Sequence, residues 1–303
     1  MASKLTPEQR RRQRWREKLI VGTLMAAAVS SVLITLGIIG VLVYESAAFF
    51  EHVALRTFLT DTVWTPLFAE PRYGILPLLT GTLLSTVVAL AVAAPLGLTA
   101  AVYLSEFAAP RVREVIKPAL EMLSGVPTVV YGFFALLFVT PLLQATILPT
   151  LPGFNILSAG IVIGIMILPY IASLSEDAMR AVPQALRDGS LAMGATKFET
   201  AVRVVLPAAF SGIAAAFVLA LSRAVGETMI VAIAAGQQPN LTLNPREPAA
   251  TITAYIVQVA LGDLPHGSIG YQSIFAAGLM LFLMTLAFNI LAFWLRRRYR
   301  EAY

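Results

Sequence analysis

Long apolar runs constrain this chain more than any other feature. Residues 122–175 contain no Asp, Glu, Lys or Arg across 54 positions, whereas a helix crosses the hydrocarbon core of a bilayer with roughly 20 apolar residues. At about 1.5 Å per helical residue, a helix of this length would be far longer than one crossing of the bilayer. Only 13% of the 303 residues are charged, which is too few to cover a soluble domain. The sequence therefore predicts an all-α polytopic membrane protein.

The apolar runs and their interruptions predict six transmembrane helices. The turn-rich stretch LPTLPGFN at 148–155 divides the longest run into two spans. The first run, Leu19–Tyr44, is 26 residues long, which exceeds the apolar part of a cleavable signal and suits a retained anchor. We expect basic tails at 1–18 and 296–303 around one transmembrane domain, 19–295, with spans at about 19–44, 75–104, 122–147, 156–175, 208–235 and 271–295.

The placement of basic residues predicts the orientation. Of the 22 Lys and Arg residues, 18 fall in the two tails, the second-to-third connection and the connection 176–206, which six spans place on one side. Because basic residues are enriched on the cytoplasmic side, we expect both termini to be cytoplasmic. This clustering beside spans also makes nucleic acid a poor explanation of the net charge of +5.

Two segments on the opposite side are too long to be simple turns. These are the expected outer loops 45–74 and 236–270. Within the second, Ile252, Tyr255, Ile256 and Val259 have the spacing of one helical face. We expect a short helix there that packs in the loop or lies at the interface, because it is too short and too polar to span.

Composition also limits the chemistry. The chain has no Cys and two His residues, so we expect no disulfide, no metal site and no resident cofactor. A phosphate-cradling loop needs a glycine-rich turn that ends in Gly-Lys, and no lysine here follows a glycine. If ATP drives this protein, another chain must hydrolyse it.

The inner connection 176–206 has the signals of a helix, a glycine and a second helix. Pro183 suits a first helical turn, and Gly194 suits the position after a helix end. Thr196 and Glu199 have the spacing of a capping box, which predicts a second helix as far as Leu206. On local physics alone, an ordinary connector is an equally good interpretation.

The spacing in this connection resembles the cytoplasmic EAA loop of ATP-binding-cassette importer permeases. That loop has a triplet EAA, then Gly after three residues, then Ile after nine residues, one residue, and Leu-Pro. Here the matching positions are Asp188, Gly189, Ser190, Gly194, Val204, Leu206 and Pro207, so the triplet has drifted while every spacing is kept. The resemblance implies a coupling helix that docks into a groove of an ATPase subunit, with an apolar face supplied by Leu186, Leu191 and Met193.

Arg223 and Glu227 lie in the middle of the fifth apolar run. A charge at mid-bilayer costs about 2.5–3.5 kcal/mol on insertion scales, so both need partners. On a helix, residues four apart share a face, and the two can form a purely structural pair. The alternative is a transport pathway, since the planar guanidinium fork matches a tetrahedral oxyanion. We include Ser222 and Thr228 in that candidate pathway.

SRAVGETMIV (222–231) is similar to a stretch of phosphate-specific permeases, and the likeness extends from about Phe49 to Arg298. The Thr-Met after Gly-Glu favours the C-type permease over its A-type partner. The resemblance implies the type I importer permease architecture, with Arg223 as the anion contact and Glu227 as its counter-charge. Pro95 and the stretch 125–127 are candidate flexible points in the spans, although packing is the better explanation of each.

The same resemblance implies a set of partners and a location. A second, related permease forms a heterodimeric pore with this chain, two copies of an ATPase bind below and use ATP, and a phosphate-binding protein docks outside. The assembly belongs in lipid, in the inner membrane of a bacterium or archaeon, and this chain is itself no enzyme.

Three other functions stay open at this point. The chain can be a permease for another oxyanion, such as sulfate or molybdate. A passive channel is a second alternative, although it gives no purpose to an EAA-type loop. An intramembrane enzyme is the most distant one, because only Arg223 and Glu227 are charged deep in a span and catalytic groups do not converge.

Overall fold

The computed structural model describes residues 7–298, so the outer parts of the two expected tails lie outside the described residues. Helices account for nearly all of the regular structure, and the only strand-like feature among the described residues is an isolated bridge between Trp64 and Tyr73. The α-helices are α1 (Pro7–His52), α2 (Leu55–Thr60), α3 (Leu76–Val102), α4 (Pro110–Ser124), α5 (Thr128–Phe134), α6 (Thr140–Thr146), α7 (Ile156–Arg180), α8 (Gln184–Ala192), α9 (Lys197–Thr200), α10 (Leu206–Ala208), α11 (Phe210–Val225), α12 (Ile252–Ala260) and α13 (Ile269–Arg298). Short π-helical segments continue some of them: η1 (Tyr103–Phe107), η2 (Ala135–Val139), η3 (Ala201–Val205) and η4 (Val231–Ala235).

Six spans are present if one bent pair is counted. Five helices of the described chain are long and apolar enough to cross a membrane, and the sixth is a pair, Lys197–Ala208 and Phe210–Val225, bent by 72°. The expected fifth span, 208–235, is therefore not one helix, because α11 ends at Val225. The third candidate span runs from Thr128 to Thr146, so the stretch 125–127 lies just before it, between α4 and α5. The expected start of this span at residue 122 is therefore wrong, because residues 122–124 belong to α4. Pro95, in contrast, lies inside the continuous helix α3 and does not interrupt it.

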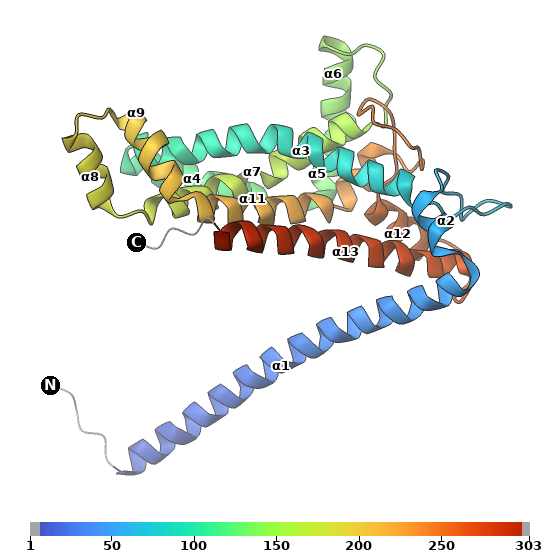
Figure 1. Cartoon of the computed structure of the whole chain (residues 1–303), viewed down its shortest axis with the longest axis horizontal. Helices are drawn as coiled ribbons and strands as arrows, with labels where there is room; N and C mark the ends of the chain where they lie inside the picture. The colour runs from blue at the N-terminus through green and yellow to red at the C-terminus, as the bar shows by residue number, and fades with distance from the viewer. Residues whose placement is uncertain (1–6, 299–303) are drawn as a thin grey trace.

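Helix α7 forms the centre of the bundle because small residues let its neighbours approach closely. Gly160 and Gly164 have the small-xxx-small spacing that brings membrane helices together. A Cβ on Gly160 would lie 2.6 Å from Val88 Cβ, and one on Gly164 would lie 2.8 Å from the carbonyl oxygen of Ala89. These contacts join α3 and α7 along the middle of the bundle (Figure 1). The pair thus forms a closely packed unit that leaves no space for larger side chains.

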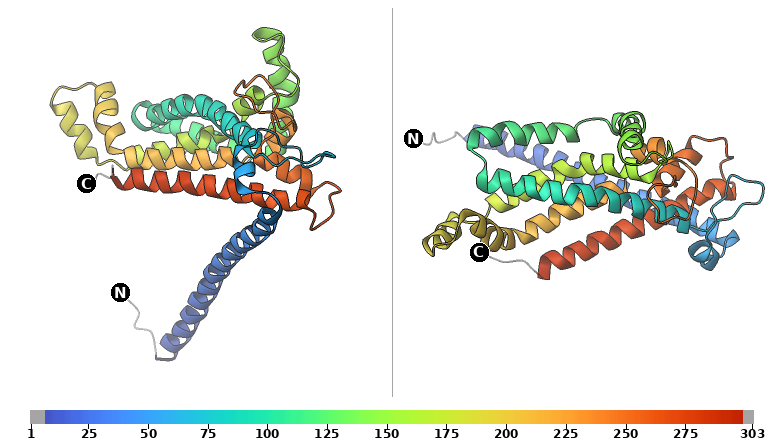
Figure 2. Two further views of the ribbon diagram at one scale, coloured as in Figure 1. Left: turned by 45° about the vertical axis from the view of Figure 1, so that its right-hand side comes forward. Right: turned by 90° about the horizontal axis from the view of Figure 1, so that it is seen from above.

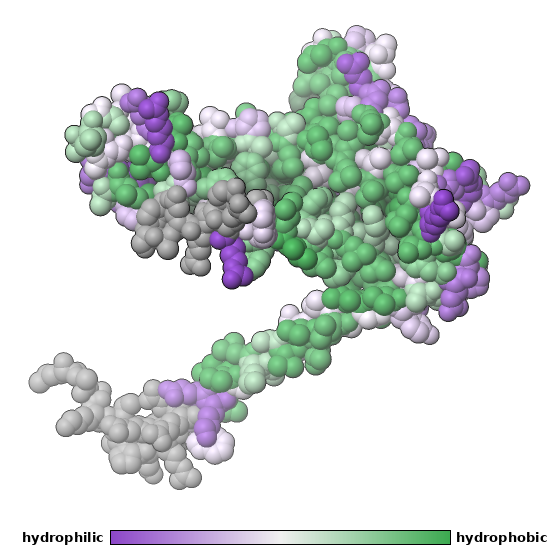
Figure 3. All heavy atoms as spheres, viewed as in Figure 1, coloured by the Kyte–Doolittle hydropathy of each residue, from purple (hydrophilic) through white to green (hydrophobic). Residues whose placement is uncertain are grey.

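Helix α1 diverges from the rest of the bundle. The C-terminal part of α1 packs against α13, whereas its N-terminal part lies away from the other helices (Figures 1 and 2). Residues 15–38 are exposed along their whole length. Figure 3 shows this part of α1 as an apolar rod with its polar residues gathered near the start. Such a surface is suited to lipid or to another apolar protein surface.

The two ends of the bundle differ in character. The start of α1, the start of α4, α8 and the end of α13 lie at one end, which is where the four basic segments were expected to meet (Figures 1 and 2). Helices α2 and α12 and the loops beside them form the other end. There, Trp64 packs edge-on against Tyr255, with ring centroids 5.0 Å apart. The helix expected in the second outer loop is confirmed as α12, and its predicted apolar face packs in this cluster.

Candidate functional site

The fifth span is interrupted beside its two charged residues. Helix α11 ends at Val225, Gly226 follows as its C-cap, and helical structure resumes at Met229. Glycine is a poor helix former. The side chain of the next residue, Glu227, hydrogen-bonds backbone N–H groups that follow it in the chain. The carboxylate oxygen Oε1 of Glu227 accepts hydrogen bonds from the backbone N–H groups of Met229 (3.1 Å) and Ile230 (3.3 Å). Glu227 therefore caps a new short helical segment instead of continuing α11.

This geometry corrects the expected pairing of Arg223 with Glu227. Although the two residues are four apart in the sequence, they do not lie on one helix, because α11 ends between them. Glu227 is buried and bonded to backbone. Arg223 is exposed, and it makes no hydrogen bond or ion pair with any residue in the described part of the chain. The guanidinium of Arg223 thus has no counter-charge in the part of the chain that the structure describes, and it lies at the inner edge of a mid-span break.

The two hydroxyl residues of the predicted pathway lie on either side of this break. The Ser222 hydroxyl is buried and has no hydrogen-bond partner in the described chain. Thr228 donates to the carbonyl of Gly226 at 3.3 Å. The structure therefore places Arg223, Glu227, Ser222 and Thr228 on one interrupted segment, in which Arg223 is exposed, Ser222 and Thr228 are half-buried and Glu227 is buried.

Two threonines that no sequence pattern indicated bond the outer side of this break to its neighbours. Thr253, in the first turn of α12, donates to the backbone carbonyl of Glu227 at 2.7 Å. The N–H of Ile252 donates to the Thr82 hydroxyl of α3 at 3.1 Å. Because helix breaks leave carbonyls without donors, these bonds stabilise the interrupted segment against α12 and α3.

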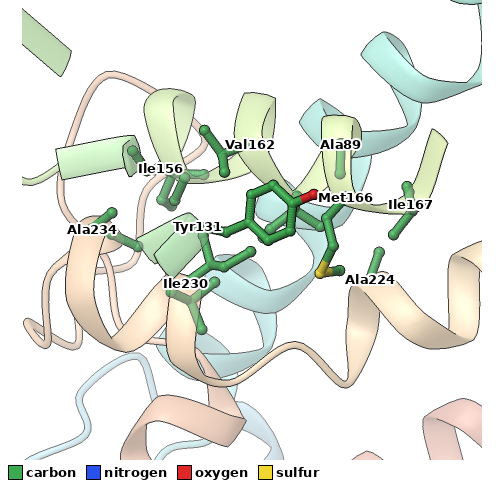
Figure 4. Close-up of a cluster of buried hydrophobic side chains, with 14 of the residues drawn as sticks. Ala89, Tyr131, Ile156, Val162, Met166, Ile167, Ala224, Ile230 and Ala234 are labelled. Atoms are coloured by element: carbon green, nitrogen blue, oxygen red, sulfur yellow. The ribbon is translucent and has the colours of Figure 1, made fainter. Parts of the chain in front are cut away.

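A second break lies beside the first. Pro127 has no N–H, so it cannot donate to the carbonyl of Leu123, four residues earlier. The hydroxyl of Tyr131 donates to that carbonyl instead, at 2.7 Å. Figure 4 shows Ala224 and Ile230, from the two sides of the fifth-span break, around Tyr131 and Met166. Both interruptions therefore share one apolar core.

The inner connection has the predicted local structure. Helix α8 ends at Ala192, and Gly194 follows with φ of +89°, a conformation that favours glycine. The capping box of Thr196 and Glu199 is present in both directions, and the chain stays helical from Lys197 to Ala208. We refer to the segment from Pro183 to Pro207 as the inner loop.

The predicted apolar face of the inner loop is only partly open. Leu191 and Met193 are exposed, and Met193 retains 89% of its accessible surface. Leu186, in contrast, is half-buried and packs against the inner core of the bundle. Phe198 and Val202 are exposed apolar residues that the sequence analysis did not select. Of the remaining predicted positions, Asp188 accepts from Gln184, Ser190 is bonded to Thr200, Leu206 is half-buried, and Gly189 and Pro207 are exposed.

A buried ion cluster at the inner end of α7 was also not predicted. The Glu176 side chain is fully buried, and its oxygens lie 2.7 Å from Arg113 Nε and 2.7 Å from Lys117 Nζ of α4. Lys117 also contacts Asp177. Burial alone lowers the pKa of Lys117, but its hydrogen bonds to Asp177 and Glu176 raise the pKa above its ordinary value. The cluster therefore fixes α4 to α7 with charged partners on both sides.

The fold and the interrupted span define a multi-pass membrane protein built like the permease of a transporter. The sequence pattern of the binding-protein-dependent transport system inner membrane component family matches residues 93–301. The chain belongs to this family.

Individual relatives agree with that assignment. A probable ABC transporter permease protein YqgH of Bacillus subtilis is 35% identical over 275 residues, which cover 91% of this chain and 87% of the relative. The phosphate transport system permease protein PstC of Mesorhizobium japonicum is 35% identical over 257 residues, covering 78% and 76%. A solved bacterial alginate ABC transporter, in complex with a periplasmic protein that carries an alginate pentasaccharide, has the same fold with a TM-score of 0.62. It is 17% identical and covers 94% of this chain and 96% of its own.

Proposed function

We propose that this chain is a permease subunit of an ATP-driven phosphate importer, of the C type. The observation that carries this proposal is Arg223, an arginine at a mid-span helix break whose side chain has no partner among the described residues. A charge within a membrane span is energetically costly, and charged residues found there commonly face a substrate pathway. Its fork binds a tetrahedral oxyanion by two parallel hydrogen bonds. The relatives named for phosphate transport support phosphate as that anion.

Glu227 has a different role from the one expected. It forms no ion pair with Arg223, and its Oε1 accepts from the backbone N–H groups of residues 229 and 230. We propose that it shapes the break and sets a negative potential on the outer side of Arg223. This arrangement favours release, because an anion held by Arg223 is repelled from the adjacent carboxylate at short range.

The remaining parts of the importer are supplied by other chains. A second permease completes the pore, two ATPase subunits bind the inner loop and use ATP, and a phosphate-binding protein docks on the outer end. The exposed Leu191 and Met193 support helix-in-groove docking of the inner loop. The chain itself is non-catalytic, it binds no cofactor of its own, and it resides in the inner membrane of a bacterium or archaeon.

Uptake of radiolabelled phosphate tests the function. Cells that lack the gene are complemented with it and assayed with excess sulfate or molybdate as competitor. We expect uptake to depend on the gene and to be insensitive to either competitor. Equal competition by sulfate would show a broader oxyanion permease, and flux without ATP in proteoliposomes would show a passive channel.

Replacing Gly194 with arginine tests the docking of the inner loop. A non-glycine residue at φ of +89° costs about 1–2 kcal/mol, and the bulky side chain sits beside the exposed Met193. We expect Gly194→Arg to abolish co-purification of the ATPase while the permease still folds.

The matched control is Gly267→Arg. Gly267 has φ of +85° and also has open space around it, but it lies in the outer loop. The backbone strain is therefore equal, and we expect the ATPase to co-purify. Retention of the ATPase by Gly194→Arg would rule out docking through this turn.

A further inference from the structure

The guanidinium of Arg187 makes several hydrogen bonds within the chain. Arg187 belongs to α8, in the inner loop. Its Nη1 donates to the carbonyl of Val182 (2.6 Å), and Nη2 donates to the carbonyl of Met179 (2.8 Å). Nε and Nη2 also donate to the two carboxylate oxygens of Glu106, at 3.2 and 3.0 Å. The side chains of Arg187 and Glu106 retain only 12% and 11% of their accessible surface. This is a fork-to-fork ion pair with two further bonds to backbone.

The two backbone bonds replace donors that are missing where α7 ends. Pro183 has no N–H to give to Met179, the residue four positions earlier. The N–H of Leu186 donates to Pro183 rather than to Val182. The Met179 carbonyl accepts from the N–H of Val182 at 3.1 Å, and the Arg187 guanidinium adds a second bond to it. The same guanidinium bonds the Val182 carbonyl, which lacks its Leu186 donor, and so takes the place of the next helical turn. Helix α8 is therefore bonded directly to the inner end of α7.

The ion pair connects α8 to a second span. Glu106 belongs to η1, the continuation of α3, and Ser105 donates to it at 2.7 Å. Above this point, α3 and α7 are packed through the glycine contacts at Gly160 and Gly164, where backbone and Cβ atoms cannot yield. One arginine thus connects the exposed inner helix to both members of the most closely packed helix pair.

We propose that Arg187 is the positioning residue that makes α8, α3 and α7 move as one rigid body during transport. The proposal rests on the proposed coupling function of the inner loop. A displacement of α8 by the ATPase is then transmitted along the second and fourth spans without loss. Without the four bonds, α8 pivots on its flanking turns and the displacement does not reach the mid-span breaks.

Removing the guanidinium tests this linkage. In the assembled transporter, we expect Arg187→Gln to keep the ATPase bound and hydrolysing ATP while phosphate uptake falls at least tenfold. Arg187→Lys carries one point charge that cannot make the four bonds, so it is expected to remain impaired. The matched control is Arg180→Gln, since Arg180 is half-exposed and lies 3.8 Å from Glu176. Normal uptake by Arg187→Gln overturns the proposal.

A crosslink separates rigid linkage from simple instability. Ser105 and Gln184 line one cavity of about 230 Å³ between η1 and α8, and the chain has no other cysteine to interfere. A double variant carries Ser105→Cys and Gln184→Cys, and a short bifunctional thiol reagent crosslinks the two introduced thiols. We expect the crosslinked transporter to keep its uptake, and the crosslinked Arg187→Gln form to regain it within about twofold. Loss of uptake on crosslinking shows that the two elements must separate, which contradicts the proposal.

A distance measurement makes the result independent of phosphate. Spin labels on the same two cysteines are expected to give one narrow distance that does not change when ATP and vanadate are added. The Arg187→Gln form is expected to give a broad distribution. A distance that shifts with nucleotide refutes the rigid body, whereas absence of uptake by the unmodified transporter refutes only the proposed substrate.

Discussion

Replacing Arg223 with glutamine is expected to lower phosphate uptake by roughly 10- to 150-fold without loss of the assembled complex. A hydrogen bond to a charged group contributes about 1.5–3 kcal/mol, and each 1.4 kcal/mol is a factor of ten. Arg223 is exposed and its side chain is unpaired among residues 7–298, so its removal leaves no buried partner there unsatisfied. Arg223→Lys keeps the charge but not the fork, and we expect it to transport poorly. Initial rates of labelled phosphate uptake, divided by the amount of co-purified ATPase, measure the effect.

The comparison variant for this experiment is Arg246→Gln. Arg246 is also exposed, but it lies in the outer loop between η4 and α12. We expect its uptake to stay within about twofold of the unmodified protein. Normal transport by Arg223→Gln would assign Arg223 to packing against the second permease and remove it from the pathway.

Substituting Gly164 with isoleucine is expected to prevent stable folding of the bundle. An added Cβ would lie 2.8 Å from the Ala89 carbonyl and 2.9 Å from Val92 Cβ, and a carbonyl on a helix cannot move aside alone. Overpacking of a tight interface costs about 3 kcal/mol, a large part of the stability of a typical domain. We expect little monodisperse protein in detergent, and a lowered unfolding midpoint for what remains.

Gly37→Ile provides the matched change in α1. Gly37 also lies within a long apolar helix, but nothing approaches its Cβ position within 4 Å. The change in helix propensity is the same at both positions, and only the contact differs. Equal recovery of the two variants would show that the glycines of α7 do not set the separation of α3 and α7.

The number of spans and the inner loop could be predicted because their signals are local. Span length follows from bilayer thickness, and the loop followed from a capping box and a glycine at fixed spacing. The boundary of α11 could not be placed in the same way, because apolar residues continue on both sides of Gly226. What ended the helix was the Glu227 carboxylate bonding its own backbone, which hydropathy does not reveal. The pair Gly226-Glu227 was the available signal.

The contacts that organise the candidate site are long-range. Arg187 and Glu106 are 81 residues apart in the sequence, and Thr253 and Glu227 are 26 apart. Neither pair has a spacing that a local pattern records. The close packing of α7 against α3 had a signal in the GxxxG of Gly160 and Gly164, but the spacing alone does not name the facing helix.

The outlying helix α1 has a consequence for how the protein is made. Helix α1 packs mainly against α13, which begins 217 residues after α1 ends. Phe49 and Phe50 at its C-terminal end also contact the earlier helix α2, through Phe58. At about 5–20 residues per second, roughly 10 to 45 s pass before α13 is synthesised. Residues 19–44 contain no charged side chain, so α1 is stable in lipid by itself during this interval. The contact between α1 and α13 therefore forms only after the other described spans have been synthesised.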